Sequence, residues 1–207
     1  MKLDNEIHKI ENIHVDIPYQ WILRRLGYEK GDSPDSSTLS IIKNNVAMAV
    51  ADSNCSGAFR IFKINSIKKS EIIFETNVKI KSYSISKYLS DCHYAAMIFA
   101  TAGSKISSDI ESDIVGEKMT EALIIDAAGS EIADAAIDEV QCILSSSIKK
   151  SGLKMKDARF SPGYGDFLLS NQKLFYKLLN MSEHKIKLTK TFQFIPEKTV
   201  TAICGLR

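Results

Sequence analysis

The sequence predicts an α+β fold with a largely antiparallel sheet. Helical patterns occur in blocks that separate groups of strand patterns, and strands do not alternate regularly with helices. No glycine-rich turn follows the first strand pattern. These observations argue against a doubly wound nucleotide-binding fold, because that fold needs regular alternation and a glycine-rich first turn.

The first part of the chain contains one strand pattern and two helical patterns. Residues 13–17 form an apolar run typical of a strand, and a helical pattern follows from Pro18 to Leu26 and ends at Gly27. Ser33 and Pro34 predict the start of the second helix, since serine caps helices and proline suits the first helical position. The apolar residues of this helix recur at helical spacing: Leu39, Ile42, Val46 and Val50.

The middle of the chain predicts the central part of the sheet. Alternating β-branched and aromatic residues predict strands at 58–64, 71–74 and 78–80. Residues 84–91 predict a short helix. The continuous apolar run at 93–102 predicts a central strand that is covered on both faces.

The second half begins with a predicted helix at 106–115 and the longest helical pattern, at 117–150, which Gly152 ends. One apolar face supports the long helix: Ile125, Gly129, Ile132, Ala136, Val140 and Ile143. The remaining predicted elements are a helix at 171–180 and strands at 186–188, 191–194 and 199–204.

The composition is that of an ordinary soluble globular protein, and we expect one domain over residues 1–207. Hydrophobic residues make up 44% of the chain and charged residues 25%. A net charge of +2 and scattered lysines give no reason to expect nucleic acid or a membrane as partner. No signal peptide or membrane-spanning stretch is visible, so we expect a cytoplasmic protein.

Cysteines and histidines do not indicate a metal site or a disulfide framework. The four cysteines lie far apart without paired spacing, and the four histidines form no ligand cluster. We therefore expect reduced, buried thiols: Cys55, Cys92, Cys142 and Cys204.

The segment 159–166 has the residues of a small-molecule binding loop. Arg159 offers a planar fork of donors that fits a carboxylate. Gly163 and Gly165 allow positive φ and close approach of a ligand to the backbone, and Tyr164 adds an aromatic face with a hydroxyl tip. This combination suits a zwitterionic small molecule with a flat ring.

The loop resembles the Arg-x-x-Pro-Gly-Tyr signature of the activation domain of cobalamin-dependent methionine synthase, which binds S-adenosylmethionine. The resemblance continues downstream in a segment similar to the family's Leu-Thr-x-x-Phe-x-x-x-Pro-x-x-x-Val: Leu188, Thr189, Phe192, Pro196 and Val200. It covers the C-terminal half well and the N-terminal half loosely. It implies a bent antiparallel sheet with helices packed around it.

The resemblance assigns ligand contacts to the loop. It implies that Arg159 contacts the carboxylate of S-adenosylmethionine, that Ser161 contributes its backbone, and that Gly163 shapes the turn. Tyr164 matches the family's tyrosine. The alternatives are a surface salt bridge for Arg159 and a half-buried core position for Tyr164.

The long predicted helix carries acids that could face the sulfonium of the same ligand. Glu131, Asp134 and Asp138 are spaced three and four residues apart, so they lie on one face of the helix. Asp134 matches a ligand-binding acid of the family, and Glu131 is the second candidate. The alternative is the solvent-facing side of an amphipathic helix.

Two parts of the family pattern are missing or weak. The family's N-terminal Asp-Trp segment has only Asp16 as a match, and Trp21 is not adjacent to it in sequence. A further ligand-facing tyrosine of the family lies beyond position 207, and Tyr19 or Tyr28 could replace it. The chain also lacks an Asp-x-His-x-x-Gly segment for binding cobalamin, so it resembles a free-standing activation subunit.

The resemblance implies a function in reactivation. The protein would hold S-adenosylmethionine over inactive cobalamin that is carried by a separate methionine synthase core, while a flavodoxin-like reductant supplies an electron. An exposed apolar or mixed patch beside the loop is expected for docking. The alternatives are an activator or structural subunit of another corrinoid methyltransferase, and an independent small-molecule methyltransferase.

Overall fold

The computed structural model describes residues 5–17 and 19–207. Its main sheet has the strand order β4-β3-β2-β5-β9-β6, and β1 also pairs with β2. Every pairing is antiparallel. The strands are β1 (Ile7–Ile10), β2 (Ser56–Lys68), β3 (Glu71–Phe74), β4 (Lys79–Lys81), β5 (Tyr94–Thr101), β6 (Met155–Phe160) and β9 (Thr199–Leu206). A separate hairpin consists of β7 (Lys187–Leu188) and β8 (Phe194–Ile195).

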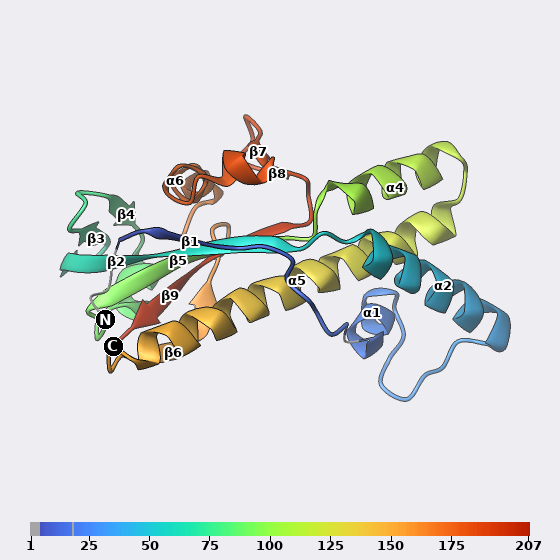
Figure 1. Cartoon of the computed structure of the whole chain (residues 1–207), viewed down its shortest axis with the longest axis horizontal. Coiled ribbons are helices and arrows are strands. Elements are labelled where there is room, and N and C mark those ends of the chain that lie inside the picture. Colours follow the sequence, from blue (N-terminus) through green and yellow to red (C-terminus); the bar gives the residue numbers. More distant parts are fainter. Residues whose placement is uncertain (1–4, 18) are drawn as a thin grey trace.

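Helices lie on both sides of the sheet (Figure 1). The long helix α5 crosses one side, whereas α6 and the β7–β8 hairpin lie on the other. The α-helices are α1 (Tyr19–Arg25), α2 (Ser36–Asp52), α3 (Tyr83–Tyr88), α4 (Ser104–Val115), α5 (Met119–Lys149) and α6 (Gln172–Leu178). Two short 3-10 helices span Leu169–Asn171 (η1) and Met181–His184 (η2).

The core has two parts, one on each side of the sheet. Along β5, Ala96 and Ile98 pack with α5, whereas Met97 and Phe99 pack with the residues of α3 and α6. All four side chains are fully buried. The prediction of a central strand covered on both faces is therefore confirmed, and so is the α+β class.

The approach of α5 to the sheet depends on Gly57 in β2. A Cβ atom at Gly57 would lie 2.4 Å from the carbonyl oxygen of Phe99 and 2.7 Å from a methyl group of Val140. Only a residue without a side chain leaves room for the neighbouring strand and the helix together.

Two predicted boundaries near the N-terminus were wrong. Residues 13–17 are not a strand, and the first strand is instead β1, which pairs with β2. The second helix starts at Ser36 rather than at Pro34, because the carboxylate of Asp35 accepts hydrogen bonds from the backbone N–H groups of Ser37 and Thr38. The predicted first helix is found as α1, although Pro18 lies outside the described residues.

The C-terminal half follows the predictions with two differences. The strand β6 was missed, and Arg159 belongs to it rather than to the bend that follows. The strand predicted at 191–194 is a two-residue strand, β8. The helices and the last strand are found close to their predicted positions.

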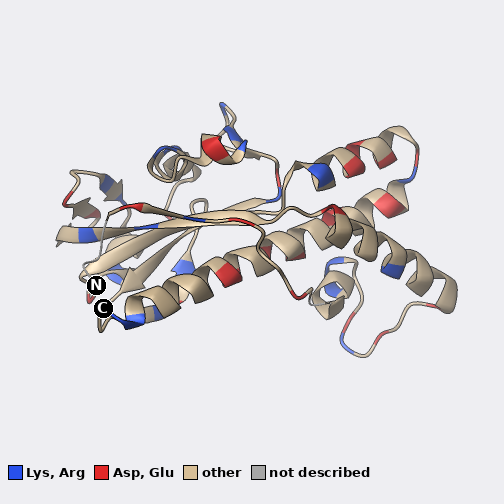
Figure 2. Cartoon of the chain, in the orientation of Figure 1, with Lys and Arg blue, Asp and Glu red and all other residues tan. Residues whose placement is uncertain are grey.

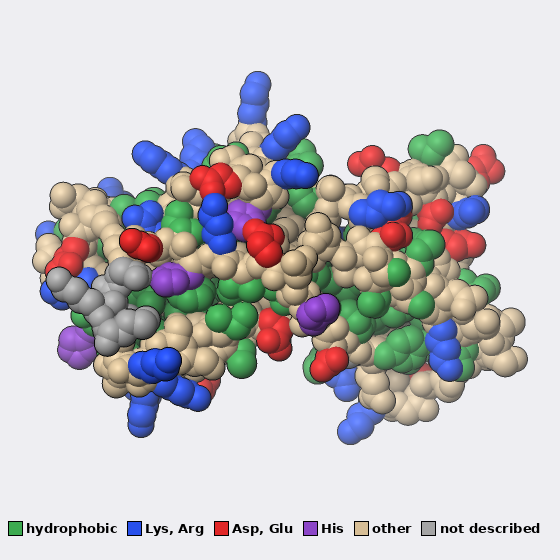
Figure 3. All heavy atoms as spheres, in the orientation of Figure 1, with side chains coloured by type: hydrophobic (Ala, Val, Ile, Leu, Met, Phe, Trp, Pro, Cys, Tyr) green, Lys and Arg blue, Asp and Glu red, His purple; other side chains and the backbone are tan. Residues whose placement is uncertain are grey.

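Charge is distributed unevenly over these elements. Acidic residues recur along α5 (Figure 2). Basic side chains project from the region of α6 and the β7–β8 hairpin (Figure 3), although the spacing in the sequence predicted scattered lysines. The lysines of this region are Lys173, Lys177, Lys185, Lys187 and Lys190.

Candidate functional site

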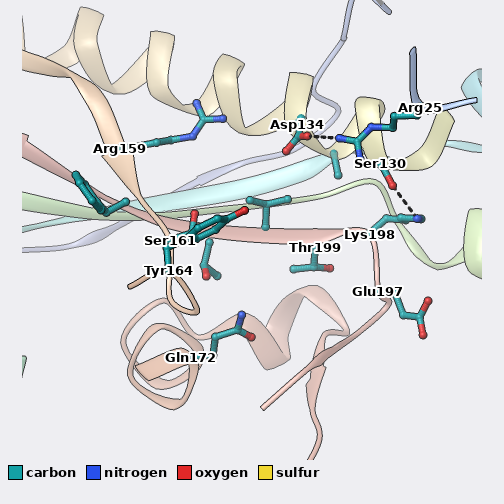
Figure 4. Close-up of a pocket in the computed structure, with 14 residues that line it drawn as sticks. Arg25, Ser130, Asp134, Arg159, Ser161, Tyr164, Gln172, Glu197, Lys198 and Thr199 are labelled. Atoms are coloured by element: carbon teal, nitrogen blue, oxygen red, sulfur yellow. Dashed lines mark hydrogen bonds and ion pairs between the residues drawn. The ribbon is translucent and has the colours of Figure 1, made fainter. Parts of the chain in front are cut away.

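A cleft of about 660 Å³ opens where β6 separates from β9. The last paired residues are Phe160 and Ile203, so the edge of β9 at 199–201 has no neighbouring strand on this side within the described residues. The middle of α5, the bend after β6 and the start of α6 close the other sides (Figure 4). The cleft therefore has a free strand edge along its wall, and backbone groups at such an edge can bind a ligand.

Arg159 lines this cleft, and its guanidinium group forms hydrogen bonds with side chains of α5. Its Nη1 donates to the carboxylate of Asp138 and, at 2.8 Å, to Oε1 of Gln141. Its side chain is 26% exposed. Both of these contacts use Nη1, which leaves the Nε and Nη2 edge of the guanidinium group as the edge suited to a carboxylate.

The bend after β6 has the predicted backbone geometry. Gly163 and Gly165 have φ values of 104° and 58°, and the Gly163 N–H donates to the carbonyl of Phe167 at 2.7 Å. Gly163 shapes the turn without lining the cleft, whereas Ser161 and Tyr164 do line it. Tyr164 is 71% exposed, so the core alternative for this tyrosine does not apply.

Asp166 ties the bend to the start of α3. Its carboxylate accepts hydrogen bonds from Ser82 Oγ at 2.9 Å and from the backbone N–H groups of Tyr83 and Ser84. Hydrogen bonding from Ser84 and then from Ser82 lowers the pKa of Asp166 to about 2. The bend is thus fixed at its far end by a charged contact.

The two acids proposed on the long helix have different surroundings. Asp134 lines the cleft beside Arg159, whereas Glu131 is not among its lining residues. Both acids accept hydrogen bonds from Arg25 of α1. Arg25 Nη2 donates to Asp134 Oδ2 at 2.9 Å, and Arg25 Nε donates to Glu131. Burial raises the pKa of Asp134, and the charge of Arg25 opposes that shift.

A second cleft lies on the other side of these acids. It is lined by Asp16 and Trp21 together with Glu131, Asp134 and Asp138. The structure therefore brings the weak N-terminal candidates close to the acids of α5, although they are far apart in sequence. Tyr19 and Tyr28, which were considered as replacements for the family's last tyrosine, line neither cleft.

Several residues that the sequence did not indicate also line the cleft, among them Arg25, Gln172, Lys198 and Thr201. Lys198 is 9% exposed and donates to Asp126 at 2.7 Å and to Ser130 at 2.9 Å. Thr201 is 3% exposed, and its Oγ1 and the Gln172 Oε1 are buried without a hydrogen-bond partner among the described residues. Both residues line the cleft, so each places a polar atom without a protein partner beside it.

Exposed apolar side chains follow the bend in the chain. Leu168 is 62% exposed and Leu169 is 37% exposed, and both follow Tyr164 closely in the chain. A methyl group of Leu169 lies 3.4 Å from the position that a Cβ atom of Gly163 would take. Two apolar side chains are therefore exposed beside the loop, and the docking patch expected there stays a prediction.

The cysteines are all unpaired, but one is not buried. Cys55, Cys92 and Cys204 are buried, whereas Cys142 is exposed on α5, so the expectation of burial was wrong for that residue. Within residues 5–17 and 19–207, no three His, Cys, Asp or Glu side chains are placed to hold a metal ion. No helix of the same part of the chain has the length and apolar character needed to cross a membrane.

The fold defines an α+β class in which one long helix crosses a mostly antiparallel sheet. Neither a family model nor a curated protein sequence matches the chain. Among solved structures, the chain is similar to the MetH reactivation domain bound to AdoHcy, with a TM-score of 0.71 and 12% sequence identity. The match covers 97% of this chain and 78% of that chain. It confirms the fold that the sequence resemblance implied.

The unpaired hydroxyl of Thr201 leads to a prediction about stability. Thr201→Val should raise the free energy of unfolding by about 0.5–1 kcal/mol, because it removes a buried hydroxyl that lacks a partner. Thr199→Val should lower it by about 1 kcal/mol, because Thr199 Oγ1 donates to Thr101 and to the carbonyl of Pro196. Urea denaturation of both variants checks the opposite signs; destabilisation by Thr201→Val would contradict the assignment.

The contact of Asp166 with α3 leads to a prediction about pH. Because its pKa is lowered on folding, the carboxylate stabilises the protein above its ordinary value of 3.8, and this contribution is lost as the pH falls through about 2. Asp166→Asn should therefore lower the melting temperature at neutral pH, and the difference from wild type should shrink as the pH approaches about 2. Thermal denaturation across this range tests it, and a constant difference would exclude the contact as its cause.

Proposed function

We propose that this protein binds S-adenosylmethionine in the cleft between α5 and β9 and presents it to cobalamin carried by another protein. The observation that carries the proposal is the convergence of Arg159, Tyr164 and Asp134 on one cleft. The unpaired polar atoms of Thr201 and Gln172 fit a ligand with several hydrogen-bonding groups. Likeness in fold to a domain described as bound to AdoHcy supports the same ligand class.

Arg159 holds the carboxylate of the ligand in this proposal. Asp138 and Gln141 fix the guanidinium group through Nη1, so less side-chain freedom is lost when its other edge binds an anion. The contact with Asp138 also keeps the cation paired when the cleft is empty. The salt bridge is therefore compatible with ligand binding and prepares the arginine for it.

The other end of the cleft suits the nucleoside part of the ligand. Tyr164 offers an exposed aromatic face, and Gln172 offers both an amide donor and an acceptor. Thr201 can donate or accept from the wall formed by β9. Ser161 extends the polar wall beyond the end of β6.

The residues of this chain bind and orient rather than react. In this proposal S-adenosylmethionine would supply the methyl group to cobalamin on the partner and leave as AdoHcy, and a flavodoxin-like reductant would supply the electron. Proximity and orientation are sufficient for such a role. In this proposal, the exposed apolar residues beside the bend, Leu168 and Leu169, would contact the partner that carries cobalamin.

Removal of the Arg159 guanidinium tests ligand binding. Arg159→Gln should weaken S-adenosylmethionine binding by about 10- to 100-fold, because a charge-assisted contact with the carboxylate is lost. Isothermal titration calorimetry measures the change. Arg207→Gln is the matched control, because Arg207 pairs with Asp91 outside the cleft. No binding by the wild-type protein, or equal binding by Arg159→Gln, would contradict the proposal.

Reconstitution tests the role in reactivation. The protein is added to oxidised cobalamin on a methionine synthase core that lacks its own reactivation domain, together with reductant and S-adenosylmethionine labelled in its methyl group. We expect label on cobalamin only when all components are present. Label transfer to a small molecule without cobalamin would favour the independent methyltransferase, and transfer only on another corrinoid protein would favour the other subunit role.

A further inference from the structure

The short helix α1 places a guanidinium group where a cationic part of the ligand would bind. Arg25 is the last residue of α1 and reaches the acids of α5 (Figure 4). Its Nη2 donates to Asp134 Oδ2 at 2.9 Å, and its Nε donates to Glu131. Arg25 itself lines the cleft beside Asp134. One cation therefore already neutralises the carboxylate that a sulfonium would approach.

The two contacts of Arg25 differ in their access to solvent. The side chain of Glu131 is 11% exposed, whereas that of Asp134 is 46% exposed. Arg25 can thus release Asp134 and keep its pairing with the more buried Glu131. Loss of both contacts would destabilise the protein, because it would leave the buried carboxylate of Glu131 unpaired. Exchange of the contact with Asp134 would not have this cost.

We infer that Arg25 is a specificity-determining residue: a tethered counter-ion that competes with the cationic centre of the ligand for Asp134. This inference rests on the proposed function and adds a charge preference to it. The sulfonium of S-adenosylmethionine displaces Arg25 from Asp134. The loss of this ion pair reduces the net free energy that the ligand gains on binding. AdoHcy carries the same ammonium and carboxylate groups but a neutral thioether in place of the sulfonium, so it leaves the contact in place and does not meet this competition.

The contact between α1 and α5 has a simpler structural explanation that the test must separate. α1 buries only Ile22 completely, so the two ion pairs of Arg25 also hold the helix in place. Loss of such a structural contact would change the binding of both ligands in the same direction. Competition changes only the affinity for the cationic ligand, so the ratio of the two affinities is the informative quantity.

The experiment measures the dissociation constants of S-adenosylmethionine and AdoHcy for the full chain by calorimetry. Arg25→Gln should strengthen S-adenosylmethionine binding by about three- to tenfold and leave AdoHcy binding within about twofold of wild type. The matched control is Arg24→Gln, which removes the same charge from the neighbouring residue. The guanidinium carbon of Arg24 lies 4.5 Å from the ring centre of Trp21, whereas the ion pairs with Glu131 and Asp134 are formed by Arg25.

A second variant protects the test against misfolding. Arg25→Lys keeps the charge, so the ratio of the two affinities should stay within about twofold of wild type even if α1 is held less firmly. An equal change in both dissociation constants in Arg25→Gln would overturn the inference about Arg25 and leave the proposed function standing. The same change in the affinity ratio in Arg24→Gln would do so as well. Absence of binding of either ligand to the wild-type protein overturns the proposed function, and this inference with it.

Discussion

The carboxylates along α5 fix the positions of three cations that line the cleft. Asp126 holds Lys198, Glu131 and Asp134 hold Arg25, and Asp138 holds Arg159. Lys198 directly precedes β9, whereas Arg25 and Arg159 belong to α1 and β6, so the three cations are far apart in sequence. One rigid helix thus sets the arrangement of charge contributed by three other elements, and its own position depends on the close contact with β2 at Gly57. Disturbance of α5 would therefore affect the whole cleft.

The cleft itself results from the way the sheet ends. β9 pairs with β5 along its whole length, but β6 pairs with β9 only up to Phe160 and Ile203. Beyond that point the chain turns away through Gly163 and Gly165, and the hydrogen bonds of Asp166 direct it toward α3. The bend therefore does two things at once: it exposes a strand edge and carries Tyr164 to the mouth of the opening.

The sequence predicted most of the fold because the strongest signals are local. The apolar run that became β5 and the long amphipathic pattern that became α5 are readable without tertiary information. β6 was missed because Met155–Phe160 is half polar and forms a strand only through pairing with β9. Asp35 was missed as a cap because Ser33 and Pro34 gave a stronger local signal two residues earlier.

The candidate site was only partly predictable for a similar reason. The residues of the bend could be found because they are contiguous in sequence. Arg25, Lys198 and Thr201 have no distinguishing pattern around them, and only the fold brings them beside Asp134. Asp134 illustrates this limit: the pattern of α5 predicts a carboxylate without a cationic partner, but α1 provides Arg25 for it. The net charge of this cleft is therefore a property of the tertiary structure, because Arg25 of α1 pairs with Asp134 of α5.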